Sequence, residues 1–95
     1  MTSQVDPKLF NEIYDEGYTQ HYKEKAMVEI NKHLQQRLDM KPQDKGDEFT
    51  TFFFQFEEDY ARGVGNTGLI TLNLSVDMMR RHDDMEKIII STENN

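Results

Sequence analysis

The first forty residues carry apolar side chains at the spacing of an α-helix. Asp6 followed by Pro7 is a helix-start signal, because an Asp side chain accepts from free first-turn amides and proline is tolerated at the first helical position. Two apolar stripes follow, formed by Phe10, Ile13 and Tyr14 and then by Met27, Ile30, Leu34 and Leu38. The stripes do not share a phase at about 3.6 residues per turn. We therefore predict a helix over residues 6–16, a kink or break near Gly17, and a longer helix over 19–39.

The middle of the chain changes to a pattern that is typical of β-strands. Residues 47–60 read DEFTTFFFQFEEDY, and alternate phenylalanines would point to opposite faces of a strand. Residues 69–76, LITLNLSV, alternate apolar and polar positions cleanly. Two such runs on either side of a glycine-rich segment, residues 63–68, indicate an antiparallel hairpin.

The last apolar run is ambiguous. Met78, Met85 and Ile89 would share a face of a helix, whereas Lys87 to Ser91 could equally form a third strand. We favour the helix. The predicted fold is α+β: an N-terminal helical region packed on a small antiparallel sheet built around the hairpin, with a C-terminal helix. The chain is expected to form a single small domain over residues 1–95, with 1–5 and 91–95 frayed.

Composition limits the class of protein. Leu, Ile, Val and Phe supply 22 of the 95 residues, so we expect a modest core that a homodimer could supplement. The absence of cysteine excludes disulfides and thiolate chemistry. With no signal-peptide pattern and no apolar run long enough for a membrane span, the sequence favours a cytoplasmic protein that does not bind membranes.

The charge is concentrated in one segment. The formal net charge is −7, and residues 39–60 hold two lysines against seven acids, a net −5. Such a balance disfavours direct nucleic-acid binding, which needs clustered bases to contact phosphates. Acids beside the phenylalanine-rich segment could keep the chain soluble, or they could attract a partner with a basic surface. The acidic residues proposed for such an interface are Asp47, Glu48, Glu57, Glu58 and Asp59.

A row of tyrosines adds a second candidate surface. Tyr14, Tyr18 and Tyr22 are four residues apart, so they would form a ridge along a continuous helix. Tyrosine is enriched at interfaces because it combines a rigid apolar ring with a polar tip, although the same rings could instead cover the sheet.

The segment GVGNTG, residues 63–68, matches the G-x-G-x-x-G pattern of dinucleotide-binding loops. That chemistry requires a strand before the loop and a helix after it, whereas here a strand pattern follows. The favoured interpretation is that Gly63, Gly65 and Gly68 serve the hairpin turn. The alternative is an anion or nucleotide site at this loop, with Arg62, Arg80, Arg81 and His82 as contacts.

No catalytic constellation is visible, and no cofactor or metal is predicted. His82, Asp83 and Asp84 are adjacent, so on a helix they point in different directions and cannot close a coordination sphere by themselves. His21 and His33 are twelve residues apart, not the four that suit one metal. The sequence thus favours a non-catalytic acidic binding module of the inhibitor, immunity, adaptor or chaperone type. The alternative is a small anionic-ligand protein, which could be an enzyme.

Overall fold

The computed structural model describes residues 4–15, 17–65 and 76–94, and within them the protein is all-helical. Helices make up 81% of these residues, and they contain no strand. The elements are α1 (Pro7–Ile13), α2 (Gln20–Arg37), the short 3₁₀ helix η1 (Pro42–Asp44), α3 (Lys45–Gly63) and α4 (Val76–Glu93). The predicted α+β fold is therefore wrong.

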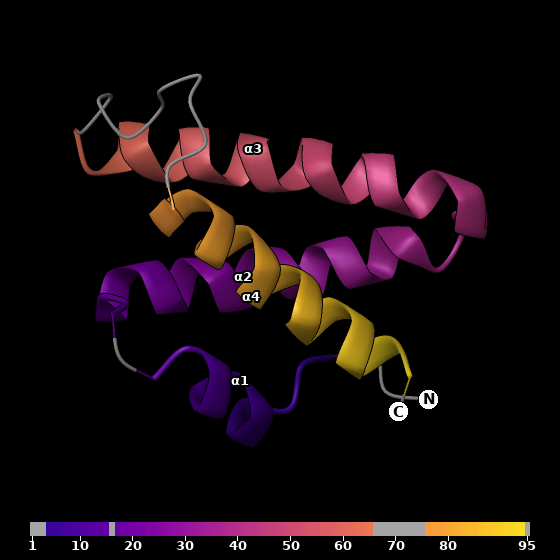
Figure 1. Ribbon diagram of the computed structural model, residues 1–95, viewed down its shortest axis with the longest axis horizontal. Coiled ribbons are helices and arrows are strands. Elements are labelled where there is room, and N and C mark those ends of the chain that lie inside the picture. The colour runs from indigo at the N-terminus through magenta and orange to yellow at the C-terminus, as the bar shows by residue number, and fades with distance from the viewer. Residues whose placement is uncertain (1–3, 16, 66–75, 95) are drawn as a thin grey trace.

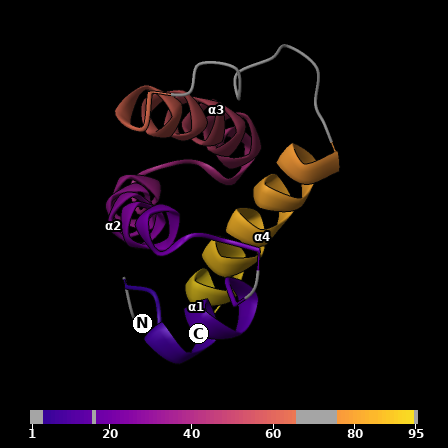
Figure 2. The ribbon, with the colours of Figure 1, turned by 90° about the vertical axis from the view of Figure 1, so that its left-hand side faces the viewer.

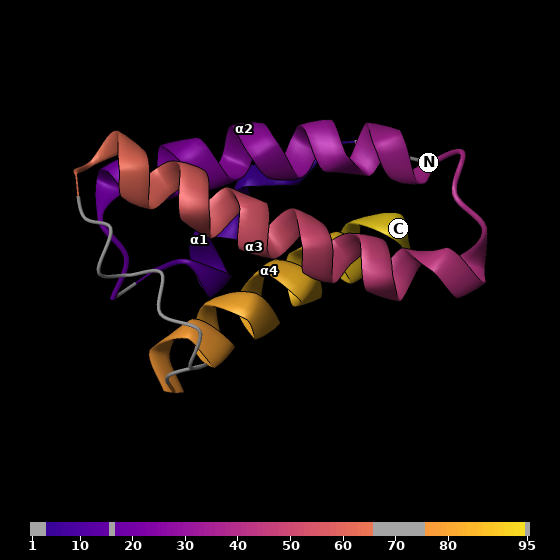
Figure 3. The same cartoon turned by 90° about the horizontal axis from the view of Figure 1, so that it is seen from above.

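Helices α2 and α3 lie side by side in opposite directions, joined by the turn that contains η1 (Figure 1). Helix α4 crosses this pair diagonally, as the view from above shows (Figure 3). The short α1 lies against α4 and below α2, on the side away from α3 (Figure 2). The core between these elements is formed mainly by Tyr14, Ile30, Phe53, Met85 and Ile88, all with no exposed surface.

The break near Gly17 is confirmed. Asp6 caps α1 by accepting from the Lys8 amide at 3.1 Å, and Thr19 caps α2 by accepting from the Tyr22 amide at 3.1 Å. Gly17 lies between them with a φ of +85°, in the left-handed region that suits glycine. The capping residues fix two separate helix starts, which is why the two apolar stripes differ in phase.

The predicted strand over residues 47–60 is part of helix α3. Its buried residues Phe49, Phe53 and Phe56 are four and three residues apart, which is helical spacing, whereas Phe54 is exposed at 42%. A run of phenylalanines fits the two-residue period of a strand as well as the period of a helix. The alternation alone therefore did not distinguish a strand from a helix. The helix is 19 residues long, and its acidic first turn, with Asp47 and Glu48, suits the helix dipole.

The hairpin prediction is not supported at the end that the structure describes. Gly63 ends α3, and Gly65 follows the C-cap with a φ of +72°. The Gly65 amide donates to the Arg62 carbonyl at 3.1 Å, so this glycine terminates a helix rather than turning a hairpin. Gly68 and residues 69–75 of the strand predicted over 69–76 lie outside the described residues, and the last residue of that prediction, Val76, begins α4 instead.

The C-terminal helix is confirmed, and Met85 to Ser91 is helical rather than a strand. Helix α4 continues to Glu93, and the Thr92 hydroxyl is buried and donates to the Ile88 carbonyl at 2.8 Å. At the other end of the chain Val5 is buried, and its amide donates to the Asn31 side chain at 2.8 Å. None of the described helices has the length and apolar character needed to cross a membrane.

Candidate functional site

The tyrosines proposed for an interface lie mostly inside the protein. Tyr14 and Tyr22 are buried and Tyr18 is half-buried. Their rings contact one another across the α1–α2 break, with centroids 4.6 Å apart for Tyr14 and Tyr18 and 5.3 Å for Tyr18 and Tyr22. The ridge thus contributes to packing between helices, and Tyr14 and Tyr22 present no free surface.

Glu57 is also inside, at 5% exposure, at the centre of a polar network. The Tyr22 hydroxyl donates to one carboxylate oxygen at 2.8 Å, and the Arg81 Nε donates to the other at 2.8 Å. These contacts join α2, α3 and α4. A buried charge needs such partners, so this acid holds helices together and is not available to a basic partner.

A second contact of the same kind joins the α1–α2 region to α4. The Tyr18 hydroxyl donates to Asp84 at 2.6 Å, and the Arg80 guanidinium lies over the Tyr18 ring, 5.2 Å from its centroid. Burial, together with the neighbouring acids, raises the pKa of Tyr14, Tyr18 and Tyr22, so all three phenols stay neutral at physiological pH.

The remaining acids of the predicted interface are at the surface. Asp47 and Glu48 are exposed in the first turn of α3, and Asp59 is exposed near its end. Arg62 pairs with Glu58, at 2.6 Å, and with Asp59. Part of the acidity of this segment is therefore neutralised within the protein.

Each arginine proposed to hold an anion has a partner of its own among the described residues. Arg62 pairs with acids of its own helix, Arg81 pairs with Glu57, and Arg80 lies on Tyr18. Gly63 and Gly65 lie at the carboxyl end of α3, where the helix dipole is negative and disfavours phosphate. Gly68 lies outside the described residues, so the anion site predicted over residues 63–68 stays a prediction for the second half of that segment.

Two hollows between α3 and α4 bring exposed apolar and acidic side chains together. We call the two hollows the α3–α4 groove. One hollow, of about 220 Å³, is lined by Thr50, Phe54, Met79, His82 and Asp83. A second, of about 150 Å³, lies between Arg37 and Lys45 on one side and Glu86, Ile89 and Ile90 on the other, with Gly46 and Phe49 also lining it.

The walls of the groove expose side chains that a folded core would normally cover. Phe54 is 42% exposed, Met79 52% and Ile90 46%. Met79, Glu86 and Ile90 recur at helical spacing, so they form one strip along the outer side of α4. The distance along the helix axis from Met79 to Ile90 is about 16 Å, at 1.5 Å per residue.

Asp83 and Glu86 differ from several other acids of the described chain in having no Lys or Arg partner. No described Lys or Arg forms an ion pair with Asp83 or Glu86, in contrast to Glu57, Glu58 and Glu93. At the far end of the groove, Arg37 holds Glu93 through two hydrogen bonds of 2.8 and 2.9 Å. Two carboxylates of the groove are therefore not paired with a described Lys or Arg, although Arg37 and Lys45 line the second hollow and His82 contacts Asp83.

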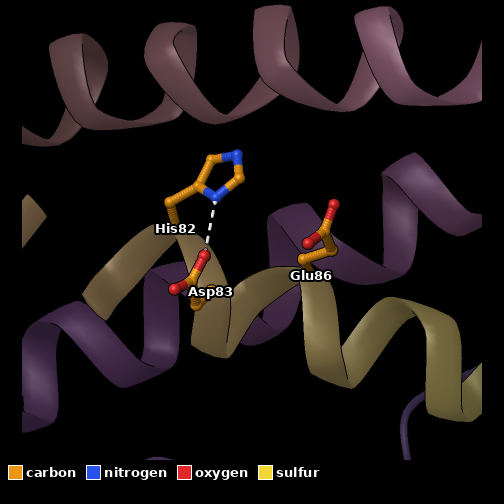
Figure 4. Close-up of side chains that lie close together, drawn as sticks. All are labelled: His82, Asp83 and Glu86. Carbon is orange, nitrogen blue, oxygen red and sulfur yellow. Dashed lines mark hydrogen bonds and ion pairs between the residues drawn. The ribbon is translucent and has the colours of Figure 1, made fainter. Parts of the chain in front are cut away.

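His82, Asp83 and Glu86 come together in the middle of the groove (Figure 4). Their ligand atoms all lie within 4.8 Å of one another, and His82 Nδ1 lies 3.2 Å from an Asp83 carboxylate oxygen. The His82 ring packs edge-on against Phe49 and Phe53, at centroid distances of 4.9 and 5.1 Å. Those two contacts fix the imidazole beside the acids.

The sequence contained a signal for this cluster that our reading missed. The prediction considered only the adjacent residues His82, Asp83 and Asp84. Of these, Asp84 points away from the cluster, because it accepts a hydrogen bond from Tyr18. Glu86, four residues after His82, lies on the same strip of the helix. A search at helical spacing rather than among adjacent residues would have found the pair.

His33 is a buried histidine outside the groove. Its ring stacks on Phe52 at 4.1 Å, and neither ring nitrogen has a hydrogen-bond partner among the described residues. Burial, with the Arg37 charge nearby, lowers its pKa, so the ring is neutral at physiological pH. His33 is thus part of the packing between α2 and α3.

Comparison with protein-family models, with curated proteins and with solved structures finds no match to this chain. The function is therefore argued from the geometry of the α3–α4 groove.

Proposed function

We propose that this protein is an acidic, non-catalytic binding module that holds a basic amphipathic helix of a partner protein in the α3–α4 groove. The observation that carries the proposal is that exposed Phe54, Met79 and Ile90 line two neighbouring hollows between α3 and α4 together with Asp83 and Glu86, two acids that have no described Lys or Arg partner. Peptide helices are commonly recognised in this way, with apolar anchors at helical spacing.

The charge of the groove selects the partner. Asp83 and Glu86 lie between the apolar groups, and Asp47 and Glu48 are exposed on the first turn of α3. A partner helix with Lys or Arg beside its apolar stripe would pair with these acids, and the net charge of −7 would increase its rate of association. An acidic or neutral helix would gain no such pairs.

The groove is better suited to this role than the other large hollow among the described residues. That hollow, of about 370 Å³, lies between α1 and α2, and Glu24 is the one acid among its lining residues. It contains one strongly exposed apolar residue, Val28. It therefore provides control positions for experiments on the α3–α4 groove.

The test is a titration with a synthetic basic peptide. Its Leu and Trp residues recur at i, i+3, i+4 and i+7, and its other residues are Lys and Ala. Because the chain has no tryptophan, the fluorescence of the peptide reports binding directly. We expect saturable one-to-one binding that weakens with salt, and none with a matched peptide in which Glu replaces Lys.

Matched variants place the binding on the groove. The double change Asp83→Lys and Glu86→Lys should weaken peptide binding at least tenfold. Glu12→Lys with Glu24→Lys alters net charge by the same amount at exposed positions on α1 and α2, and should have much less effect. Equal losses in the two variants would mean that the attraction is nonspecific, and would refute the groove as the site.

Apolar variants separate this proposal from self-association. Met79→Ala with Ile90→Ala should weaken peptide binding, whereas Val28→Ala with Leu38→Ala, which are equally exposed, should not. If sedimentation shows a homodimer of the native chain that Ile90→Asp dissociates, a second copy occupies the groove, and the proposed partner helix is wrong.

A further inference from the structure

His82, Asp83 and Glu86 supply the types of atom that bind divalent transition metals. An imidazole nitrogen and two carboxylates suit zinc, which takes His and Asp or Glu ligands at about 2.0–2.2 Å. His82 and Glu86 are four residues apart, the spacing that directs two ligands to the same side of a helix. Asp83 completes the set from the next position along the chain.

The groups are already gathered and partly fixed. All three ligand atoms lie within 4.8 Å of one another, while two ligands of a tetrahedral zinc ion are about 3.4 Å apart. Rotation of the exposed Asp83 and half-exposed Glu86 side chains would bring the ligand atoms to the shorter separation that zinc requires. The imidazole needs no such movement, since Phe49 and Phe53 hold it in place.

The local charge also favours a cation. Neither carboxylate pairs with a described Lys or Arg, and Asp83 contacts His82 Nδ1 at 3.2 Å. In the rest of the described chain, Glu57, Asp59 and Glu93 are paired with arginine. The groove is thus a place where added positive charge would be stabilised.

We propose that His82, Asp83 and Glu86 form a binding site for one Zn²⁺ ion. Three protein ligands on one helix leave at least one coordination position open to water or to another ligand, as in open rather than closed zinc sites. This inference does not rest on the proposed function, because metal binding is measured without any peptide.

The experiment is a competition titration of the tag-free chain with ZnCl₂ and a fluorescent chelator, accompanied by thermal unfolding. We expect one Zn²⁺ per chain and a melting temperature that rises with zinc concentration. MnCl₂ should bind more weakly, following the general order of divalent metal affinities. MgCl₂ should bind more weakly still, because magnesium prefers an all-oxygen site.

Variants assign the ligands. Glu86→Gln and Asp83→Asn change exposed or half-exposed carboxylates without loss of volume, and each should weaken Zn²⁺ binding at least tenfold. His82→Ala should do the same, and circular dichroism establishes whether it remains helical. The control is His21→Ala, an exposed histidine on α2, which should bind zinc as tightly as the native chain. Native affinity in Glu86→Gln and Asp83→Asn, or no one-to-one binding in the native chain, would overturn the site.

Discussion

At the scale of single residues, two buried tyrosines of one cluster differ in whether the hydroxyl group has a hydrogen-bond partner. Tyr22 donates to the buried Glu57, whereas the Tyr14 hydroxyl is buried with no hydrogen-bond partner among the described residues. A buried polar group without a partner costs free energy, and a charged acceptor that loses its donor costs more. The two hydroxyl groups should therefore have opposite effects on stability.

The prediction is a pair of matched variants. Tyr14→Phe should leave the free energy of unfolding unchanged or raise it by about 1 kcal/mol, because it removes an unsatisfied hydroxyl. Tyr22→Phe should lower it by about 1–3 kcal/mol, because it leaves a carboxylate oxygen of Glu57 without a donor. Urea unfolding followed by circular dichroism measures both. Equal losses in the two variants would contradict the hydrogen-bond assignment.

His33 should make stability depend on pH. Burial and the charge of Arg37 lower the pKa of His33 in the folded state, and the charge of Glu93, which pairs with Arg37, opposes this only in part. As the pH falls, His33 is therefore protonated in the unfolded chain before it is protonated in the folded chain. The stability that depends on neutral His33 is complete above pH about 6.5 and is lost as the pH falls toward the folded-state pKa.

The corresponding variant is His33→Phe, which keeps a ring to stack on Phe52. It should lose less stability than the native chain between pH 7 and pH 5, measured by urea unfolding at each pH. The hydrogen-bonded ion pair with Arg37 lowers the pKa of Glu93. The stability that Glu93 contributes is therefore lost at lower pH, below about 4.5. An unchanged pH profile in His33→Phe would contradict the neutral buried histidine.

At the scale of the elements, the glycine near the start of α3 and the glycine that follows its end differ in the backbone conformation they require. Gly65 has a φ of +72° just after the helix, whereas Gly46 is helical and a Cβ there would meet nothing within 4 Å. Gly65→Ala should therefore destabilise the protein by about 1 kcal/mol, and Gly46→Ala should stabilise it by about 0.5 kcal/mol. Thermal unfolding of both variants shows whether each substitution raises or lowers the stability. A stabilised Gly65→Ala would contradict the helix ending described here.

The start of α1 and the break near Gly17 were predictable, whereas helix α3 was not. Asp6 acts through a local hydrogen bond, so the residues around it are sufficient to predict a cap, and the different phases of the two apolar stripes predict the break. In α3 the five phenylalanines fit a period of two as well as a helical period. Contacts with α2 and α4 decide between these periods, and those partners are distant in sequence.

At the scale of the whole molecule, the position of each charge depends on packing. The net −5 of residues 39–60 was visible in the sequence, but the burial of Glu57 against Arg81 on α4 was not, because that pair is separated by 24 residues. The same packing leaves Phe54 and Met79 exposed beside Asp83. The acidic character was therefore predictable, while the groove that carries it was not.

The most direct test of the groove uses the methionines as probes. With ¹³C-methyl labels, the chain should show a shift of the Met79 methyl signal when the basic peptide is added, because Met79 lines the groove. Met27, which lines the hollow between α1 and α2, should not shift. We predict that the Met79 signal shifts at the same peptide concentrations that change the tryptophan fluorescence. A bound peptide that shifts Met27 and leaves Met79 unchanged would contradict it.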